Sequence, residues 1–200
     1  MIGDSRGRLT LWNARSGKKL RTFGGLFSAA HVGAVTCAAI SPNGRRAISG
    51  GGLNDKKLKV WDTETEKTIL SFNEHSGGIN SALFLVDGHH VLSADSEGGV
   101  FLWDSSSGNI ERQFETNADH HTFSSDGKYV AAAIGKYIGE TGVGVWELEL
   151  GRQIASFRWH SKWAALSLAI SSDGSRLVVG GNDGYVRVID VSSSKSEELN

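Results

Sequence analysis

The sequence has very few residues of the kinds that cross-link or stiffen a chain. Among 200 residues there is one cysteine, Cys37, and one proline, Pro42. A single cysteine excludes an intramolecular disulfide and fits a reducing compartment. Glycine is abundant instead, with 26 residues, and hydrophobic residues make up 39% of the chain. This composition favours many short strands joined by tight turns over a disordered chain.

An excess of one charge and long apolar runs are also lacking. Lys and Arg together number 21 against 22 Asp and Glu, and the densest basic clusters are pairs such as Arg45-Arg46. Nothing in this balance points to nucleic acid or an anionic membrane. The start, M-I-G-D-S-R-G-R, has no apolar core of a secretory signal, and the longest apolar stretches, such as 129–134, are too short to span a membrane. We expect an intracellular protein, cytoplasmic or nuclear, with no nucleic-acid partner and no membrane partner.

The motifs of common catalytic and metal sites are missing from the sequence. It has no P-loop, no H-E-x-x-H, no paired C-x-x-C and no G-x-S-x-G. Two histidine pairs occur, at 89–90 and 120–121, but adjacent residues of a strand point to opposite faces and zinc needs three or four convergent ligands. We therefore predict no catalytic residue, no cofactor and no metal, and we expect Cys37 to be a small buried hydrophobe.

One short phrase recurs five times along the chain. It reads L-T-L-W-N, L-K-V-W-D, V-F-L-W-D, V-G-V-W-E and V-R-V-I-D, and its large residues are Trp12, Trp61, Trp103, Trp146 and Ile189. These positions are separated by 49, 42, 43 and 43 residues. The phrase alternates apolar and polar residues, which is typical of a short strand. We predict strands at about 8–13, 57–62, 99–104, 142–147 and 185–190.

The phrase belongs to a longer unit of four strands, here named a to d, in which it is strand c. In four repeats a phenylalanine closes the next strand 11 residues after the tryptophan: Phe23, Phe72, Phe114 and Phe157. Upstream, a strand ends in a glycine turn at Gly44, Gly88, Gly127 and Gly174. A four-stranded unit with a period of about 42 is the signature of a propeller blade.

The repeats resemble the WD-repeat family. The clearest stretch is H-V-G-A-V-T-C-A-A-I-S-P-N-G at 31–44, followed by K-L-K-V-W-D at 57–62. The resemblance implies an all-β, partial β-propeller of four-stranded antiparallel blades, about four and a half of them, in an open arc rather than a complete seven-blade ring. The expected parts are a half blade with strands c and d (1–24), three blades (31–73, 75–115 and 116–158), and a fifth blade (160–200) with a weak last strand near 195–200.

The family resemblance also implies a hydrogen-bonded set of His, Ser or Thr, Asp and Trp in each blade, with a structural role. Blade two offers His31, Ser49, Asp55 and Trp61. Blade three offers His75, Ser93 and Trp103, with Glu97 where the family has Asp. Blade four offers Trp146 and Glu140 but no His in the right place, and blade five offers His160 and Asp183, with Ile189 where Trp belongs. The incomplete sets lead us to expect that the last two blades depend more on packing.

The family resemblance implies a non-enzymatic scaffold for protein–protein interaction, and we expect this chain to be a piece of a longer polypeptide. The alternative is a regulatory propeller of a larger enzyme whose catalytic domain is absent from this chain. The sequence does not identify the protein partner. Self-association, or completion of the ring by another chain, is a second way in which the open ends of such an arc can be covered, and a strained closure of five blades is a third.

The partner-binding prediction comes from the lengths of the connections. Only the d–a and b–c connections vary in length between repeats, and antiparallel order puts both at the same end of a blade. They carry large apolar side chains and a lysine, which are typical interface residues. The candidates are Leu26, Phe27, Tyr137, Ile138, Trp159, Lys162 and Trp163. In the alternative interpretation, Trp159 or Trp163 fills the gap left by Ile189 in the core of blade five.

Overall fold

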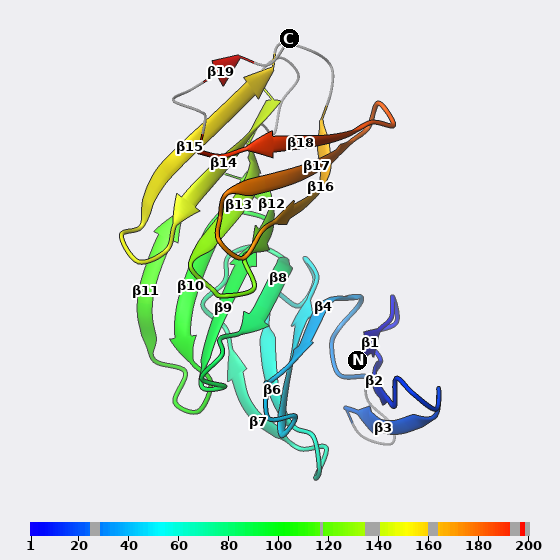
Figure 1. The fold of residues 1–200 in the computed structure, drawn as a ribbon. Helices are drawn as coiled ribbons and strands as arrows, with labels where there is room; N and C mark the ends of the chain where they lie inside the picture. The colour runs from blue at the N-terminus through cyan, green and yellow to red at the C-terminus, as the bar shows by residue number, and fades with distance from the viewer. Residues whose placement is uncertain (25–28, 117, 135–140, 160–163, 193–196, 199–200) are drawn as a thin grey trace. The chain divides into compact units, whose positions relative to one another are not determined.

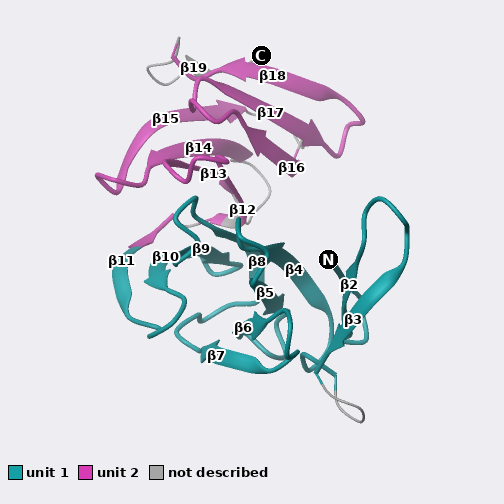
Figure 2. Cartoon of the chain, turned by 60° about the horizontal axis from the view of Figure 1, so that its bottom comes forward, with its two compact units in different colours: residues 1–113 teal, residues 114–200 magenta. Residues whose placement is uncertain are grey.

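The structure is a computed structural model that describes residues 1–24, 29–116, 118–134, 141–159, 164–192 and 197–198. The chain divides into two compact units, residues 1–113 and 114–200 (Figure 2). The described residues contain strands and turns and no helix. The all-β fold class predicted from the sequence is therefore confirmed.

The first unit contains three antiparallel sheets, each formed by consecutive strands (Figure 1). Sheet one has β1 (Ile2–Gly3), β2 (Leu9–Trp12) and β3 (Lys19–Phe23). Sheet two has β4 (Val35–Ile40), β5 (Arg46–Gly51), β6 (Leu58–Asp62) and β7 (Thr68–Phe72). Sheet three has β8 (Ile79–Phe84), β9 (His90–Asp95), β10 (Gly99–Asp104) and β11 (Ile110–Glu115), and the boundary between the units falls within β11.

The second unit contains two further sheets. Sheet four has β12 (Ala118–Phe123), β13 (Tyr129–Ile134), β14 (Thr141–Glu147) and β15 (Arg152–Trp159). Sheet five has β16 (Ala165–Ile170), β17 (Arg176–Gly181) and β18 (Val186–Asp190). The five sheets correspond to blades one to five, and the predicted c strands are confirmed as β2, β6, β10, β14 and β18.

Two details at the ends of the chain differ from the sequence prediction. Blade one was expected to have strands c and d alone, but β1 pairs with β2 as a two-residue end of strand b. A last strand near 195–200 was expected in blade five, but the described residues Glu197–Glu198 form β19, which pairs in parallel with β15 of blade four. That terminal segment lacks the closing phenylalanine of the other d strands, so the sequence gives it little apolar surface to bury beside β18.

The turn between strands a and b explains why glycine recurs there. Gly44, Gly88, Gly127 and Gly174 have φ angles of 70° to 73°, in the left-handed region that residues with a Cβ adopt at a cost. In blade two, Ser41 and Asn43 close the turn through a hydrogen bond of 2.8 Å between their side chains. The glycine spacing in the sequence therefore marks real turns.

Neighbouring blades pack through two different faces. The Trp face of a blade carries Trp12, Trp61, Trp103, Trp146 or, in blade five, Ile189. Pleating places the residues one and three positions earlier on the opposite, aliphatic face. These residues are Leu9 and Leu11, Leu58 and Val60, Val100 and Leu102, Val143 and Val145, and Val186 and Val188. The core of each unit lies where an aliphatic face meets the Trp face of the following blade.

Three such junctions lie inside the units. Between blades one and two, Leu9 and Phe23 pack against Ala47 and Trp61. Between blades two and three, Ile48, Leu58, Val60 and Phe72 pack against Val91, Phe101 and Trp103. Between blades four and five, Val143, Val145 and Phe157 pack against Leu177, Val179 and Ile189. Each large apolar side chain buried in this way contributes about 1.5–3 kcal/mol.

The phenylalanine that closes strand d contacts the tryptophan of the next blade. The rings of Phe72 and Trp103 are stacked, with centroids 4.3 Å apart and planes at 8°. The rings of Phe23 and Trp61 meet edge to face at 5.7 Å. The constant 11-residue step in the sequence therefore delivers an aromatic side chain to the next junction.

We expect blade one to open before the other blades of the first unit. Its β1 has only two residues, and one of its faces has no neighbouring sheet within the unit, so little free energy opposes its local unfolding. Amide hydrogen exchange should be fastest in residues 1–24 and slowest in β9 and β10. Equal protection of β2 and β10 would contradict this assignment.

Candidate interaction site

A chain of hydrogen bonds runs through the centre of blade two. The Trp61 Nε1–H donates to Ser49 Oγ at 2.9 Å. Ser49 Oγ lies 2.7 Å from His31 Nε2, and His31 Nδ1 lies 2.5 Å from Asp55 Oδ2. All donors and acceptors are matched when the serine hydroxyl donates to Nε2 and Nδ1–H donates to the carboxylate. The structure thus brings together the four residues that the sequence selected for this blade.

Blade three has the same arrangement but obtains its carboxylate from a different residue. His75 Nε2 lies 2.8 Å from Ser93 Oγ, which accepts the Trp103 Nε1–H at 3.0 Å. The partner of His75 Nδ1 is Asp95 Oδ2, at 2.9 Å. The assignment of this place to Glu97 was therefore wrong, because Glu97 is exposed and Asp95 is fully buried.

The two blades place their carboxylates by different routes. Asp95 is the last residue of β9 and lies two residues after Ser93, at the position that Gly51 has after Ser49. A Cβ at Gly51 would lie 2.6 Å from the Cβ of Asp55 and 2.8 Å from His31 Nδ1. Asp55 therefore occupies, from a longer b–c connection, the space that the side chain of Asp95 fills from within its strand.

Burial and hydrogen bonding shift the pKa values of Asp95 and His31. Burial alone would raise the pKa of Asp95, but hydrogen bonds from His75 and from the amides of Glu97 and Gly99 outweigh it and hold the pKa well below its usual range. Burial lowers the pKa of His31 and outweighs the opposing effect of Asp55. Both shifts make the folded state resist protonation.

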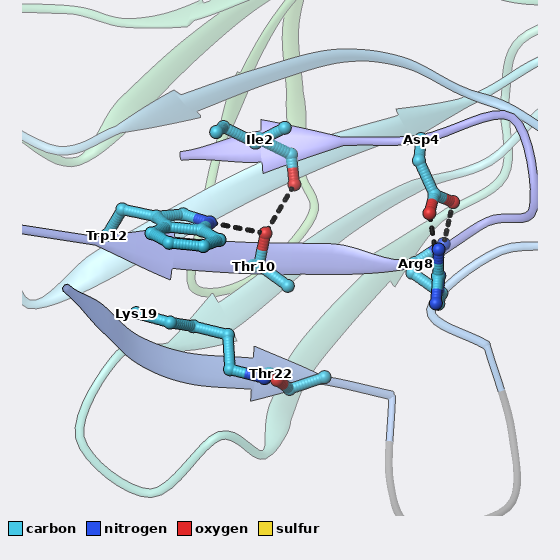
Figure 3. A pocket seen from close by; sticks show the side chains of 7 residues that line it. All are labelled: Ile2, Asp4, Arg8, Thr10, Trp12, Lys19 and Thr22. Atoms are coloured by element: carbon cyan, nitrogen blue, oxygen red, sulfur yellow. Dashed lines mark hydrogen bonds and ion pairs between the residues drawn. The ribbon is translucent and has the colours of Figure 1, made fainter. Parts of the chain in front are cut away.

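The Trp face of blade one is open within the first unit (Figure 3). Trp12 is 40% exposed, whereas Trp61 and Trp103 are buried. The Trp12 Nε1–H donates to Thr10 Oγ1 at 2.9 Å, in place of a serine on strand b, and the Thr10 hydroxyl donates to the Ile2 carbonyl at 3.2 Å. The face forms a hollow of about 380 Å³, lined by Ile2, Asp4, Arg8, Thr10, Trp12, Lys19 and Thr22.

The aliphatic face of blade five is open within the second unit. Val186 and Val188 are 70% and 69% exposed, and Val178 beside them is also exposed. Their counterparts in blade two, Leu58, Val60 and Ile48, are completely buried beneath blade three. Exposed apolar side chains that are contiguous on one surface are a common mark of an interaction site.

A third apolar surface lies at the d–a and b–c end of blade two. Val32, in the d–a connection, is 68% exposed, and Leu53, in the b–c connection, is 65% exposed. The two connections lie together: the Gly52 amide donates to the Ala34 carbonyl at 3.1 Å, and the Val32 amide donates to Asp55 at 3.3 Å. Sequence reasoning chose this end of the blade but missed both residues, because it weighed aromatic side chains first.

Comparison with known proteins identifies the repeat. A family model described as "WD domain, G-beta repeat" matches residues 17–62, 66–104 and 151–190, more than half of the chain. The chain belongs to the WD-repeat family. The resemblance read from the repeated phrase is confirmed, and so is the β-propeller type of blade.

The WD-repeat relatives include proteins named as parts of larger assemblies. The chain is 30% identical over 171 residues to the small ribosomal subunit protein RACK1y of Oryza sativa subsp. japonica. The matched region covers 81% of this chain and 49% of that protein. It is 26% identical over 190 residues to a guanine nucleotide-binding protein subunit beta of Arabidopsis thaliana, with 89% and 49% covered. The chain spans about half the length of these curated relatives.

In the second unit, the described residues alone show other contacts at the places expected for the WD-repeat set, because Glu140 and His160 lie outside the described residues. Trp146 is buried in β14. His121, which the sequence did not place in a set, lies with its Nε2 2.6 Å from the hydroxyl oxygen of Thr116. Asp183 accepts a hydrogen bond from the Arg187 guanidinium at 2.7 Å, on the surface of the b–c turn of blade five. Packing in the core shared by blades four and five surrounds Ile189 instead.

The predicted partner-binding residues have two outcomes. Leu26, Phe27, Tyr137, Ile138, Lys162 and Trp163 lie outside the described residues. Trp159 is the end of β15 and is 5% exposed, in the core that also holds Ile189 and Val191. Its burial favours the alternative in which this tryptophan fills space beside the smaller Ile189.

The Ser-His-Asp sets of blades two and three are buried within the blades. Ser, His and Asp are linked in blades two and three as they are in a catalytic triad, but Ser49 and Ser93 are completely buried and each already accepts an indole N–H. Cys37 is a free, partly buried thiol, and desolvation raises its pKa to about 12. In the part of the chain that the structure describes, no group of three His, Cys, Asp or Glu could hold a metal ion, and no helix could cross a membrane.

Asp95→Asn should lower the stability of blade three, whereas Glu97→Gln should not. Losing the buried carboxylate weakens the bond to His75 and should cost about 1–3 kcal/mol, against less than about 0.5 kcal/mol for the exposed Glu97. Thermal unfolding of the two matched variants at neutral pH measures the difference. An equal loss of stability in the two variants would contradict the assignment of Asp95, and not Glu97, as the partner of His75.

The pH dependence of stability gives a second readout on the same variants. Because the folded-state pKa of Asp95 is lowered, its stabilisation is present above the unfolded pKa, about 4, and is lost as the pH falls through the folded value. The thermal midpoint of the unmodified chain should therefore fall more steeply below about pH 4 than that of Asp95→Asn. The folded-state pKa of His31 is also lowered, so stability should fall as well below about pH 6.5. This decrease should be the same in both proteins.

Proposed function

We propose that this chain is a non-enzymatic WD-repeat scaffold that binds a protein partner at the end of the blades formed by the d–a and b–c connections. The proposal is carried by one observation: Val32 and Leu53 expose large apolar side chains on two connections that are hydrogen-bonded to each other at that end of blade two. A solvated connection does not need such side chains, and apolar clusters of this kind are common interface anchors.

The partner-binding candidates that lie outside the described residues belong to the same proposal. Phe27, Leu26, Tyr137, Ile138, Lys162 and Trp163 fall in connections of the same two kinds, and we propose that they extend the partner surface. Trp159 is left out of it because it is buried. The names of the relatives, a ribosomal subunit protein and a G-protein subunit, support a role in assemblies. We also propose a cytoplasmic or nuclear location, in keeping with the free thiol of Cys37.

The test compares charged substitutions at the two ends of a blade. Leu53→Asp should abolish retention of a co-purifying partner without changing the thermal midpoint, because Leu53 is exposed. The matched control is Val86→Asp, since Val86 is also an exposed aliphatic residue but lies in an a–b turn. Phe27→Ala and Tyr137→Ala should weaken retention in the same way.

Three results would overturn the proposal. Retention by Leu53→Asp as strong as by the unmodified chain would exclude this end of blade two. Equal loss with Val86→Asp would show that added charge acts without regard to site. Loss of the partner through a lowered thermal midpoint, as expected for the buried Trp159→Ala, would point to unfolding instead of a lost contact.

A further inference from the structure

Three connections of blades one and two are hydrogen-bonded in a row within the first unit. The His31 amide donates to the Gly7 carbonyl at 3.2 Å, which joins the b–c connection of blade one to the d–a connection of blade two. The Gly52 amide donates to the Ala34 carbonyl at 3.1 Å, which adds the b–c connection of blade two. The described residues of these connections, 4–8, 29–34 and 52–57, are named here the connection surface.

The connection surface combines exposed apolar side chains with exposed cations. Val32 and Leu53 are its large apolar residues, 68% and 65% exposed. Arg6, Lys56 and Lys57 are exposed on the same connections. Among the described residues, none of these three cations forms an ion pair. The surface therefore offers both apolar contact and positive charge to a ligand.

The two carboxylates of the connection surface are already engaged. Asp4 pairs with Arg8 at 2.6 Å. Asp55 Oδ2 lies 2.5 Å from His31 Nδ1, and the Asp55 side chain is 6% exposed. Because the acids are paired or buried and the three other cations are not, the surface presents a positive potential to the solvent.

Lys56 stands at a place that favours glycine. Its φ is 55°, in the left-handed region that a residue with a Cβ adopts at a cost. Gly7, Gly98 and Gly184 occupy the corresponding place, two residues before the first aliphatic residue of strand c, in blades one, three and five. Their φ angles are 76°, 101° and 81°. A strained lysine where the other blades have glycine points to a role for its side chain.

We propose that the connection surface binds a peptide segment in which acidic side chains flank large apolar ones. The apolar side chains of the segment cover Val32 and Leu53, and its carboxylates pair with the three cations. Exposed Glu74 and Glu97 lie on the connections of blade three and would repel such a segment, which therefore lies over blades one and two. The aliphatic residues favour a peptide over a single-stranded nucleic acid, which stacks on aromatic rings. This inference rests on the proposed function and names the chemistry of its partner.

Fluorescence anisotropy with two labelled synthetic peptide pools tests the inference on the 200-residue chain. In the acidic pool a central leucine is flanked by positions randomised among Glu, Asp, Ser and Gly, and in the basic pool Lys and Arg replace Glu and Asp. The chain should bind the acidic pool more tightly, and added salt should weaken this binding.

The variant that tests the role of the lysines combines Lys56→Gly and Lys57→Ser. Loss of two exposed ion pairs should raise the dissociation constant for the acidic pool about three- to tenfold. The thermal midpoint should not fall, because glycine adopts the left-handed backbone of residue 56 without strain. Leu53→Asp should weaken binding as well, since it removes the apolar contact and adds a like charge.

Two controls remove the same features at the other end of blade two. Glu66 also has a left-handed φ, 62°, but it lies in the c–d turn and pairs with Arg21 at 3.6 Å. Arg45 and Lys67 are exposed cations of the a–b and c–d turns. Glu66→Gly, and Arg45→Ser combined with Lys67→Ser, should bind the acidic pool like the unmodified chain.

Four results would overturn the inference: equal binding of the two pools, binding of neither pool, tighter binding of a single-stranded oligodeoxythymidylate than of the acidic pool, or equal weakening by the control that removes Arg45 and Lys67. The co-purifying partner separates this inference from the proposed function. If Leu53→Asp loses that partner and the variant lacking Lys56 and Lys57 retains it, the partner is not recognised by its acidic groups and the proposed function stands. Loss of the partner in both variants supports both proposals.

Discussion

The contact on which the rest of the structure depends is the one between a tryptophan and the phenylalanine of the preceding blade. Phe72 stacks on Trp103, and Phe23 meets Trp61 edge to face. Each sheet is too small to bury an apolar core by itself, so its stability comes from the neighbour that covers its face. The 11-residue step from tryptophan to phenylalanine sets this contact, because strand d must carry its last side chain to the next junction.

Hydrogen bonds fix the position of the tryptophan that makes this contact. In blades two and three, the indole N–H donates to a serine that is itself hydrogen-bonded to the histidine–aspartate pair. Because these groups are buried, leaving any of them without a partner would be costly. The carboxylate is what this arrangement requires, and its place in the sequence is secondary. Asp55 reaches the site over Gly51, and Asp95 reaches it from its own strand. Such a set rigidifies a junction and offers no accessible nucleophile.

The repeat made the fold predictable, and the exceptions come from interactions that the repeat does not encode. The period followed from the recurrence of the phrase, the strand c positions from its alternation of apolar and polar residues, and the a–b turns from the regularly spaced glycines. The carboxylate of blade three was misassigned to Glu97 because spacing does not report which of two nearby acids is buried. The pairing of β19 with β15 depends on a free sheet edge elsewhere in the fold. Val32 and Leu53 are apolar residues whose exposure no sequence pattern records.

A double-mutant cycle on Phe72 and Trp103 tests the dependence on this contact most directly. Phe72→Leu, Trp103→Phe and the double variant would be compared by chemical unfolding, with Phe72→Leu and Val86→Ala as a distant control pair. A stacked aromatic pair should give a coupling free energy of about 0.5–1.5 kcal/mol, and the control pair should be additive. Additive effects at Phe72 and Trp103 would contradict the account, because the two blades would then be held together by something other than this contact.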